Sequence, residues 1–249
     1  MAGLGLLLSM NPLFAETDDD SDLPEARELI DRYIEAIGGR DAVMAQAEAV
    51  MTGEFSMPAA GITAQMKVAA RPPAEQVVIV DLPGMGEMRT GVSRDLAWSL
   101  DPFMGPRLIE GEEFKSLLDN TIPEAVLRDP EYVESVSTVG RDEFLDQACY
   151  RVRIEWKSGR ESHDCYAAES GLLIAMQSTE TSPMGEIDML STLDEYREIE
   201  GVKVATVIRQ TVMGQEQVMT IEDIRFETPD AALFELPPAI QTLVEDRDG

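Results

Sequence analysis

From about residue 51 to residue 226 the chain is a succession of short strands separated by turns that carry glycine or proline. The recurring turns are Pro83-Gly84, Met104-Gly105, Lys157-Ser158-Gly159, Pro183-Met184-Gly185 and Met213-Gly214. Strands at such regular spacing predict one large antiparallel sheet, because each turn returns the chain beside the strand just completed. A sheet of this kind forms a curved surface for an apolar object more readily than a catalytic cleft.

The predicted strands occupy two stretches of the chain, separated by a break after Asp101-Pro102. We expect them over residues 49–57, 61–71, 76–82, 86–93, 97–100, 131–139, 148–157, 160–167, 172–180, 185–196, 202–212 and 215–226. A helical stretch is expected between the two groups, over residues 111–127, with an interruption at Pro123. No segment has the composition of a linker, so we expect one domain over residues 24–240 and a tail over residues 241–249.

An amphipathic helix precedes the strands, over residues 24–37. Its apolar residues follow helical spacing and form one stripe: Ala26, Leu29, Ile30, Tyr33, Ile34 and Ile37. Gly38-Gly39 ends the helix, and a second short helix is expected over residues 41–47. Such a stripe must pack on the sheet, because the helix is marginal alone in water.

Several strands are apolar on both faces. Residues 77–80 are Val-Val-Ile-Val, and residues 172–174 are Leu-Leu-Ile. A continuous apolar run indicates a strand that is covered on both sides. The helices cover one face, so either the curled sheet itself or a bound apolar ligand must cover the other.

Charge and the N-terminal segment bear on location. The 249 residues include 48 acidic and 20 basic ones, a formal charge of -28 that disfavours nucleic acid and anionic membrane surfaces. Residues 1–15 resemble the apolar part of a secretory signal, although no Lys or Arg precedes the run. An acidic segment, residues 16–23, follows and is expected to be flexible. We therefore expect an exported, soluble periplasmic protein.

Cys149 and Cys165 flank a predicted hairpin with its tip at Lys157-Ser158-Gly159. Both cysteines should project from one face, because they are an even number of residues apart on either side of the turn. A three-residue loop pairs residue 156 with residue 160 and places the cysteines on a diagonal, which is long for a disulfide. A register slip of one pair would bring them together, so the sequence leaves the bridge open.

The residues that usually carry catalysis are scarce. His163 is the only histidine and lies two residues from Cys165, but nothing around them suggests an oriented base or an oxyanion hole. No cluster has the spacing of a metal site, and the many carboxylates make any pairing uninformative. We expect no catalytic residue, no metal and no cofactor. An enzyme on this scaffold would have to use carboxylates or tyrosine.

Fourteen methionines are the remaining unusual feature. Several lie in or beside turns: Met57, Met85, Met88, Met104, Met184 and Met213. Methionine is flexible and is over-used on adaptable apolar surfaces. These side chains either line the mouth of a lipid-holding groove or fill irregular gaps in the core.

Short motifs along residues 24–240 resemble the periplasmic outer-membrane lipoprotein carrier family, known as LolA-like. The motifs are Tyr33-Ile34-Glu35-Ala36-Ile37-Gly38-Gly39, Arg71-Pro72-Pro73, Leu96-Ala97-Trp98-Ser99-Leu100-Asp101-Pro102, the run from Gly185 through Tyr196 and the C-terminal run from Phe226 to Pro237. The resemblance implies an α+β fold, an unclosed and strongly curved antiparallel half-barrel of about 11 strands with helices over the concave face. It also implies a pocket for acyl chains and a ligand-gating arginine, for which Arg71 and Arg89 are the nearest candidates. The chain departs from the family in its extra length between residues 101 and 139.

These observations predict an exported protein that binds or carries a lipid, a lipoprotein or another hydrophobic ligand, as in outer-membrane lipoprotein sorting. Its expected partners are acyl chains and envelope proteins, and not nucleic acid. The residues expected to line the cavity are Met66, Val78, Met88, Trp98 and Trp156. The alternative is a cell-envelope interaction module whose sheet is filled by its own side chains.

Overall fold

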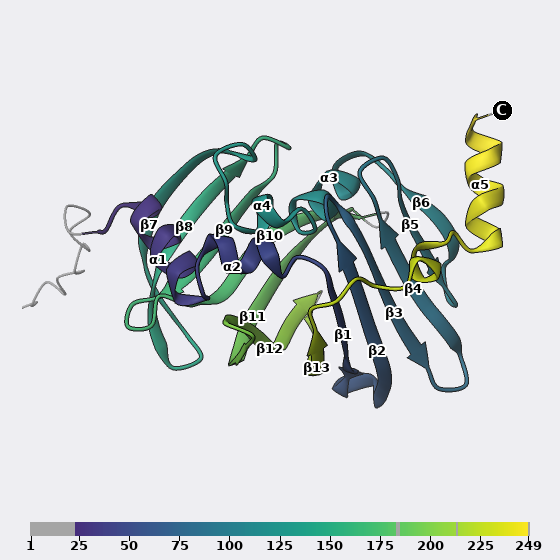
Figure 1. Ribbon diagram of the computed structural model, residues 1–249, viewed down its shortest axis with the longest axis horizontal. Helices are drawn as coiled ribbons and strands as arrows, with labels where there is room; N and C mark the ends of the chain where they lie inside the picture. The colour runs from purple at the N-terminus through teal and green to yellow at the C-terminus, as the bar shows by residue number, and fades with distance from the viewer. Residues whose placement is uncertain (1–22, 183–184, 213, 249) are drawn as a thin grey trace, which may run out of the picture.

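In the computed structural model, which describes residues 23–182, 185–212 and 214–248, the chain forms one open antiparallel sheet of 13 strands (Figure 1). The first half of the chain contributes β1 (Ala49–Met57), β2 (Ile62–Arg71), β3 (Glu75–Leu82), β4 (Gly86–Val92), β5 (Ala97–Asp101) and β6 (Gly105–Ile109). The second half contributes β7 (Val133–Phe144), β8 (Gln147–Trp156), β9 (Glu161–Ala167), β10 (Leu173–Ser182), β11 (Gly185–Ile199), β12 (Val202–Val212) and β13 (Gln215–Arg225). The predicted signal segment, residues 1–15, lies outside the described residues, as do Met184 and Met213.

The strand order shows two sequential meanders joined at one place. It runs β6-β5-β4-β3-β2-β1-β13-β12-β11-β10-β9-β8-β7, so β1 and β13 form the seam between the halves. The predicted single antiparallel sheet is therefore confirmed, and the expected strand number was slightly low. The sequence reasoning missed β6, because Gly105-Pro106 reads as a break. Proline is tolerated there because β6 is the edge strand of the sheet.

Five α-helices accompany the sheet in the described part of the chain: α1 (Ala26–Ala36), α2 (Arg40–Ala45), α3 (Gly111–Asp119), α4 (Pro123–Val126) and α5 (Pro238–Asp248). The predicted interruption at Pro123 separates α3 from α4. Helix α5 was not expected, and it packs against β6 with Ile240 fully buried. Within the described ranges no helix is long and apolar enough to cross a membrane.

One face of the sheet carries α1, and we call it the helix face. There the α1 side chains Leu29 and Ile30 pack with Val152 and Ile154 of β8. The same cluster takes in Ile122, Ala125 and Leu127 around α4, together with Trp156, Tyr166 and Leu173. We call this group the helix-covered cluster. In Figure 1, α1 and α2 lie across β8–β10, and the sheet curves toward this face.

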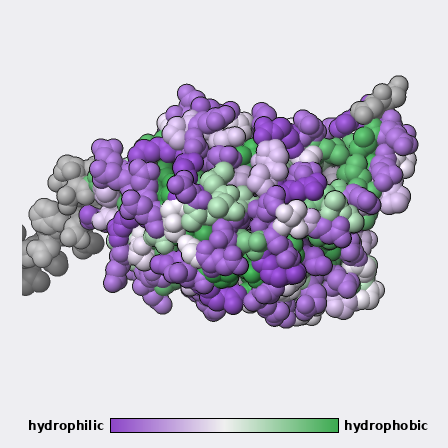
Figure 2. All heavy atoms as spheres, viewed as in Figure 1, coloured by the Kyte–Doolittle hydropathy of each residue, from purple (hydrophilic) through white to green (hydrophobic). Residues whose placement is uncertain are grey.

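The opposite face, which we call the outer face, is covered in part by the segment that follows β13. This segment contains a short 3-10 helix, Ala231–Phe234, and crosses β1–β4 before α5 (Figure 1). It packs on β3. Hydrophilic residues cover most of the side shown in Figure 2, and hydrophobic ones gather at its centre and beside α5.

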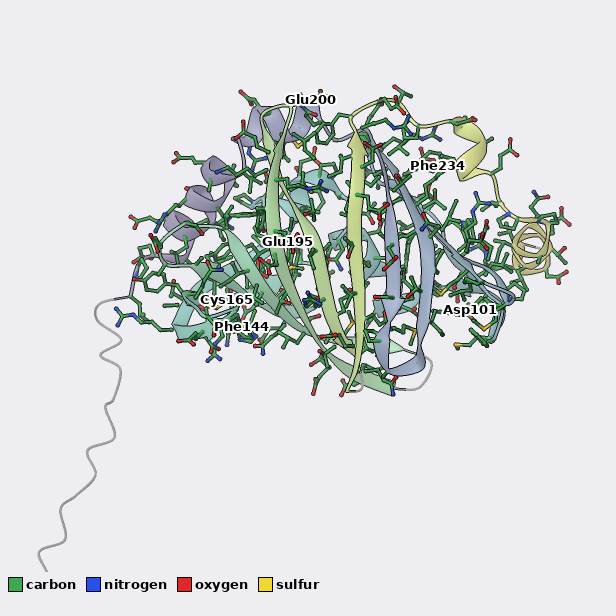
Figure 3. The ribbon with its side chains drawn as sticks, turned by 90° about the horizontal axis from the view of Figure 1, so that it is seen from below. Asp101, Phe144, Cys165, Glu195, Glu200 and Phe234 are labelled. Carbon is green, nitrogen blue, oxygen red and sulfur yellow. A yellow bond between two sulfur atoms is a disulfide. The ribbon has the colours of Figure 1, made fainter. Side chains whose placement is uncertain are left out.

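Cys149 and Cys165 form a disulfide on the outer face, with their Cα atoms 5.5 Å apart. The register is the one predicted, since Cys149 pairs with Ala167 and Arg151 pairs with Cys165, so the cysteines do lie on a diagonal. The expectation that this diagonal is too long was wrong. Strand twist shortens one of the two diagonals between neighbouring strands, and the bridge takes the short one. Phe144 packs over it (Figure 3).

Candidate ligand-binding face

A second apolar cluster occupies the helix face where the two halves of the sheet meet. Its buried members are Phe55, Ala64, Met66, Val80, Leu82, Ile221 and Ile224. Its partly buried members are Met51, Met57, Ile62, Val68, Val78, Met88, Ile199, Val204, Met219 and Phe226. Five of these side chains are methionines, and we call the group the methionine-rich cluster.

Strand register shows that this cluster is one continuous surface. Met66 of β2 lies opposite Val80 of β3, which lies opposite Met88 of β4. Directly opposed residues share a face of the sheet, so these three side chains form a row across three strands. A neighbouring row joins Met51, Val68 and Val78.

The cluster shares its face with α1. Phe55 of β1 pairs with Met219 of β13, which pairs with Ile208 of β12. Ile208 in turn pairs with Leu193 of β11, and Leu193 packs against the helix-covered cluster. The helix face is therefore covered by α1 over β8 and β9 and by α3 at β4–β6, where Phe114 packs with Val92 and Ala97. The methionine-rich cluster lines the remaining part.

Three of the five predicted lining residues come together on this surface. Met66 is buried, and Val78 and Met88 are partly buried beside it. Trp156 is also on the helix face but belongs to the helix-covered cluster, where its Nε1 donates a hydrogen bond of 2.9 Å to Ser162 Oγ. Trp98 lies on the outer face instead.

Trp98 packs across Gly91, its partner on β4. A Cβ atom at residue 91 would lie 2.4 Å from Trp98 Cε2, so only glycine allows this approach. Phe234 and Leu236 of the C-terminal segment lie with Trp98 around a small hollow of about 210 Å³. Because side chains alternate between the two faces along β5, Trp98 lies on the face opposite to the methionine-rich cluster.

The two arginines proposed from the family resemblance also lie on the outer face. Arg71 pairs with Glu75 at 2.5 Å, and its guanidinium carbon lies 4.2 Å from the centre of the Phe234 ring. Arg89 donates a hydrogen bond to the carbonyl of Leu233. Both side chains therefore fasten the C-terminal segment to the sheet.

A buried polar group lies within the helix-covered cluster, and sequence reasoning missed it. Arg128 Nε donates to Asp164 Oδ2 at 2.8 Å, and Tyr166 Oη donates to the same oxygen at 2.9 Å. Arg27 of α1 donates to the Arg128 carbonyl at 2.6 Å. Arg128 has a left-handed φ of 56°, which directs the chain out of α4. No sequence signal distinguishes this carboxylate from the many exposed ones.

Burial sets the ionisation of this group. Burial opposes the charged form of Arg128, but the charge of Asp164 and its hydrogen bond to the guanidinium outweigh that effect, and the pKa of Arg128 is raised. Burial, reinforced by Asp164, raises the pKa of Tyr166 well above its ordinary value of 10.0. Burial also raises the pKa of Tyr33, whose ring centre lies 5.6 Å from that of Tyr166. The protein thus fills this part of the helix face itself.

His163 lines a mixed polar hollow of about 750 Å³ between the β8–β9 turn and the end of β10. Cys165 is bonded to Cys149, so it offers no thiol to pair with this histidine. Across the described ranges no three histidine, cysteine or acidic residues are grouped to hold a metal ion.

No known protein-family model matches the sequence, and no curated protein matches it. Solved structures do resemble the fold. A LolA superfamily protein from Nitrosomonas europaea has a TM-score of 0.56 at 11% identity, covering 86% of this chain and 99% of that one. A putative outer membrane lipoprotein-sorting protein domain from Vibrio parahaemolyticus has a TM-score of 0.56 at 12% identity, covering 84% and 95%.

A DUF1329 family protein from Desulfovibrio piger has a TM-score of 0.58 at 14% identity, covering 84% of this chain and 97% of that one. At such identities the likeness concerns the fold. The resemblance inferred from the short sequence motifs is confirmed at that level: this chain has a LolA-like fold.

Proposed function

We propose that the protein is an exported periplasmic carrier that binds the acyl chains of a lipid or lipoprotein on the methionine-rich cluster. The observation that carries the proposal is the continuous apolar surface across β13 and β1–β4, on the helix face of an open sheet. The solved structures with the same fold include one named for lipoprotein sorting.

The residue types suit a flexible apolar ligand. Each acyl methylene removed from water contributes about 0.8 kcal/mol. Methionine side chains adapt to irregular shapes because they have three rotatable bonds and no branch. Met51, Val78, Met88 and Met219 remain partly exposed on this surface, so an acyl chain laid across them would bury apolar area that the protein leaves in contact with solvent.

Two further observations support this class of function. The Cys149–Cys165 disulfide suits an oxidising compartment such as the periplasm. The same bond removes the thiol from the one Cys-His pair in the sequence, which favours a binding protein over an enzyme. The charge of -28 disfavours nucleic acid as a partner.

The direct test is lipid mass spectrometry of protein purified from its native envelope. Delipidated protein should then take up a fluorescent fatty acid in the same stoichiometry. A matched pair of variants locates the site: Val78→Asp places a charge on the methionine-rich cluster, and Ile79→Asp places one on the outer face of the same strand. Uptake should fall at least about tenfold for Val78→Asp only. Uptake unchanged in Val78→Asp, or no lipid in either preparation, would contradict the proposal.

A second candidate is an envelope interaction module with no ligand. The deep burial of Met66, Val80 and Leu82 favours it, because these side chains already pack against their neighbours. That function predicts protein that carries no lipid and cross-links to envelope proteins through the sheet edges β6 and β7.

A further inference from the structure

Large exposed hydrophobic side chains concentrate at two hairpin tips. Among the described residues, four such side chains stand out: Phe103, Met104, Met85 and Val139, with 69%, 61%, 40% and 36% of their surfaces exposed. Phe103 and Met104 form the β5–β6 turn, and Met85 lies in the β3–β4 turn. For these two methionines, filling a gap in the core is therefore the wrong interpretation.

The two tips lie side by side. Arg89 of β4 pairs with Leu100 of β5, so the β3–β4 turn, which precedes β4, and the β5–β6 turn, which follows β5, lie at the same end of two adjacent strands. The connection between β1 and β2 is at the same end of the sheet and carries the exposed residues Pro58, Ala59 and Ala60. In Figure 3 this end, marked by Asp101, lies away from Glu200 in the β11–β12 turn.

The three turns at this end are uncharged. Residues 58–61, 83–85 and 102–104 contain no charged side chain. At the other end the β2–β3 turn, Pro72-Pro73-Ala74, is also uncharged, but the β4–β5 turn exposes Arg94 and Asp95. Acidic side chains begin at the base of the tips, at Asp81, Glu87 and Asp101. The turn residues themselves are therefore uncharged, and acidic side chains appear only where the strands begin.

The backbone of the tips is already hydrogen-bonded. Asp101 Oδ1 accepts from the amides of Phe103 and Met104, at 2.7 and 3.0 Å, and the Met85 amide donates to the Leu82 carbonyl at 3.0 Å. An amide without a partner costs several kcal/mol in an apolar medium, roughly 2–7 by transfer measurements. Because these three amides have partners, the tips can leave water without that cost.

We propose that the β3–β4 and β5–β6 tips dock the protein on the surface of a zwitterionic lipid bilayer, with Phe103, Met104 and Met85 entering the head-group region. Two narrow, convex tips suit a fluid surface, which closes around them, whereas a protein partner would need a matching pocket. The chain's charge of -28 adds repulsion from anionic lipid, so apolar burial must supply the attraction. This docking does not depend on ligand binding by the methionine-rich cluster.

The test is flotation of the protein with phosphatidylcholine vesicles. The double variant Phe103→Ser/Met104→Ser should lose about tenfold or more of its vesicle partitioning, and Val139→Ser, which removes an exposed hydrophobic side chain from β7, should lose none. Binding should persist in high salt and weaken as phosphatidylglycerol is added. Unaltered circular dichroism of both variants would show that each is folded.

A second measurement reports insertion directly. Both native tryptophans are buried, so a Phe103→Trp variant adds the one exposed indole. Brominated phosphatidylcholine should quench its emission strongly, and should not quench that of Val139→Trp. Wild-type protein that stays below the vesicles, equal flotation of the double variant, or tips that mediate dimers in sedimentation without vesicle binding would each overturn the proposal.

Discussion

The Arg128 guanidinium and the Asp164 carboxylate form an ion pair of 2.8 Å inside the helix-covered cluster, with 7% and 1% of their side chains exposed. Arg128 follows α4 and Asp164 lies on β9, so the pair connects the helical segment between β6 and β7 to the sheet. Two charges at this depth stabilise the fold only when both are present, because either one alone is a buried charge without compensation.

Asp164→Asn should therefore lower the free energy of unfolding by about 3–5 kcal/mol. The comparable change on the surface, Asp142→Asn, removes the partner of Arg151 from a pair that is 39% and 33% exposed, and it should cost less than about 1 kcal/mol. Urea unfolding at neutral pH measures both. Equal losses in the two variants would show that the buried pair has no special role.

Stability should fall as the pH rises above 10. Burial raises the folded-state pKa of Tyr33 and Tyr166 above the ordinary value of 10.0, so the folded chain keeps protons that the unfolded chain releases. The stabilisation is complete below pH 10 and is lost above it, at about 1.4 kcal/mol per pH unit for each tyrosine. In Tyr33→Phe the free energy of unfolding should fall less steeply with pH, by the contribution of one tyrosine. Urea unfolding between pH 9 and 11 measures this slope. An unchanged slope would contradict this account.

Reduction of the Cys149–Cys165 bond should lower stability by about 3 kcal/mol, as expected for a loop of roughly 15 residues. The cysteines are 16 residues apart and lie in a buried apolar cluster. Thermal unfolding with and without dithiothreitol measures the effect. The Cys149→Ala/Cys165→Ala variant should match the reduced protein and should not respond to dithiothreitol. A response would show that the reductant does not act through the Cys149–Cys165 bond.

Gly91→Ala should destabilise the fold by about 1–3 kcal/mol, because the added methyl overlaps the Trp98 ring. Trp98→Leu should relieve part of that overlap. The two changes together should then cost less than the sum of their separate effects, as a double-mutant cycle by denaturant unfolding would show. Additive losses would mean that the ring moves aside freely.

Local patterns predicted much of this fold. The bounds of β1 and β12 follow directly from alternating apolar residues that stop at the turns ending in Gly61 and Gly214, and the β8–β9 register follows from its three-residue loop. Edge strands and terminal helices carry weaker signals. Strand β6 was missed because its proline is permitted only by its edge position, and α5 because its single buried residue, Ile240, forms no stripe.

The candidate site was predictable in composition and only partly in arrangement. Met66, Val78 and Met88 lie on neighbouring strands, so short-range register brings them together. The face taken by Trp98 depends on how β5 aligns with β4, and a four-residue turn (Ser93–Leu96) does not determine that alignment. The Arg128–Asp164 pair joins residues on separate elements, and nothing in the sequence distinguishes Asp164 from the other acidic residues among the 48.

The seam between β1 and β13 has a consequence for folding kinetics. All other neighbours in the sheet are also neighbours in sequence, so each meander can assemble through short loops, whereas residues such as Met51 and Ile224 meet only when the two ends of the chain come together. Contacts between distant parts of a chain form slowly. We therefore expect two early, locally ordered halves and a late step, in which β13 adds Met219, Ile221 and Ile224 to the part of the methionine-rich cluster already formed on β1–β4.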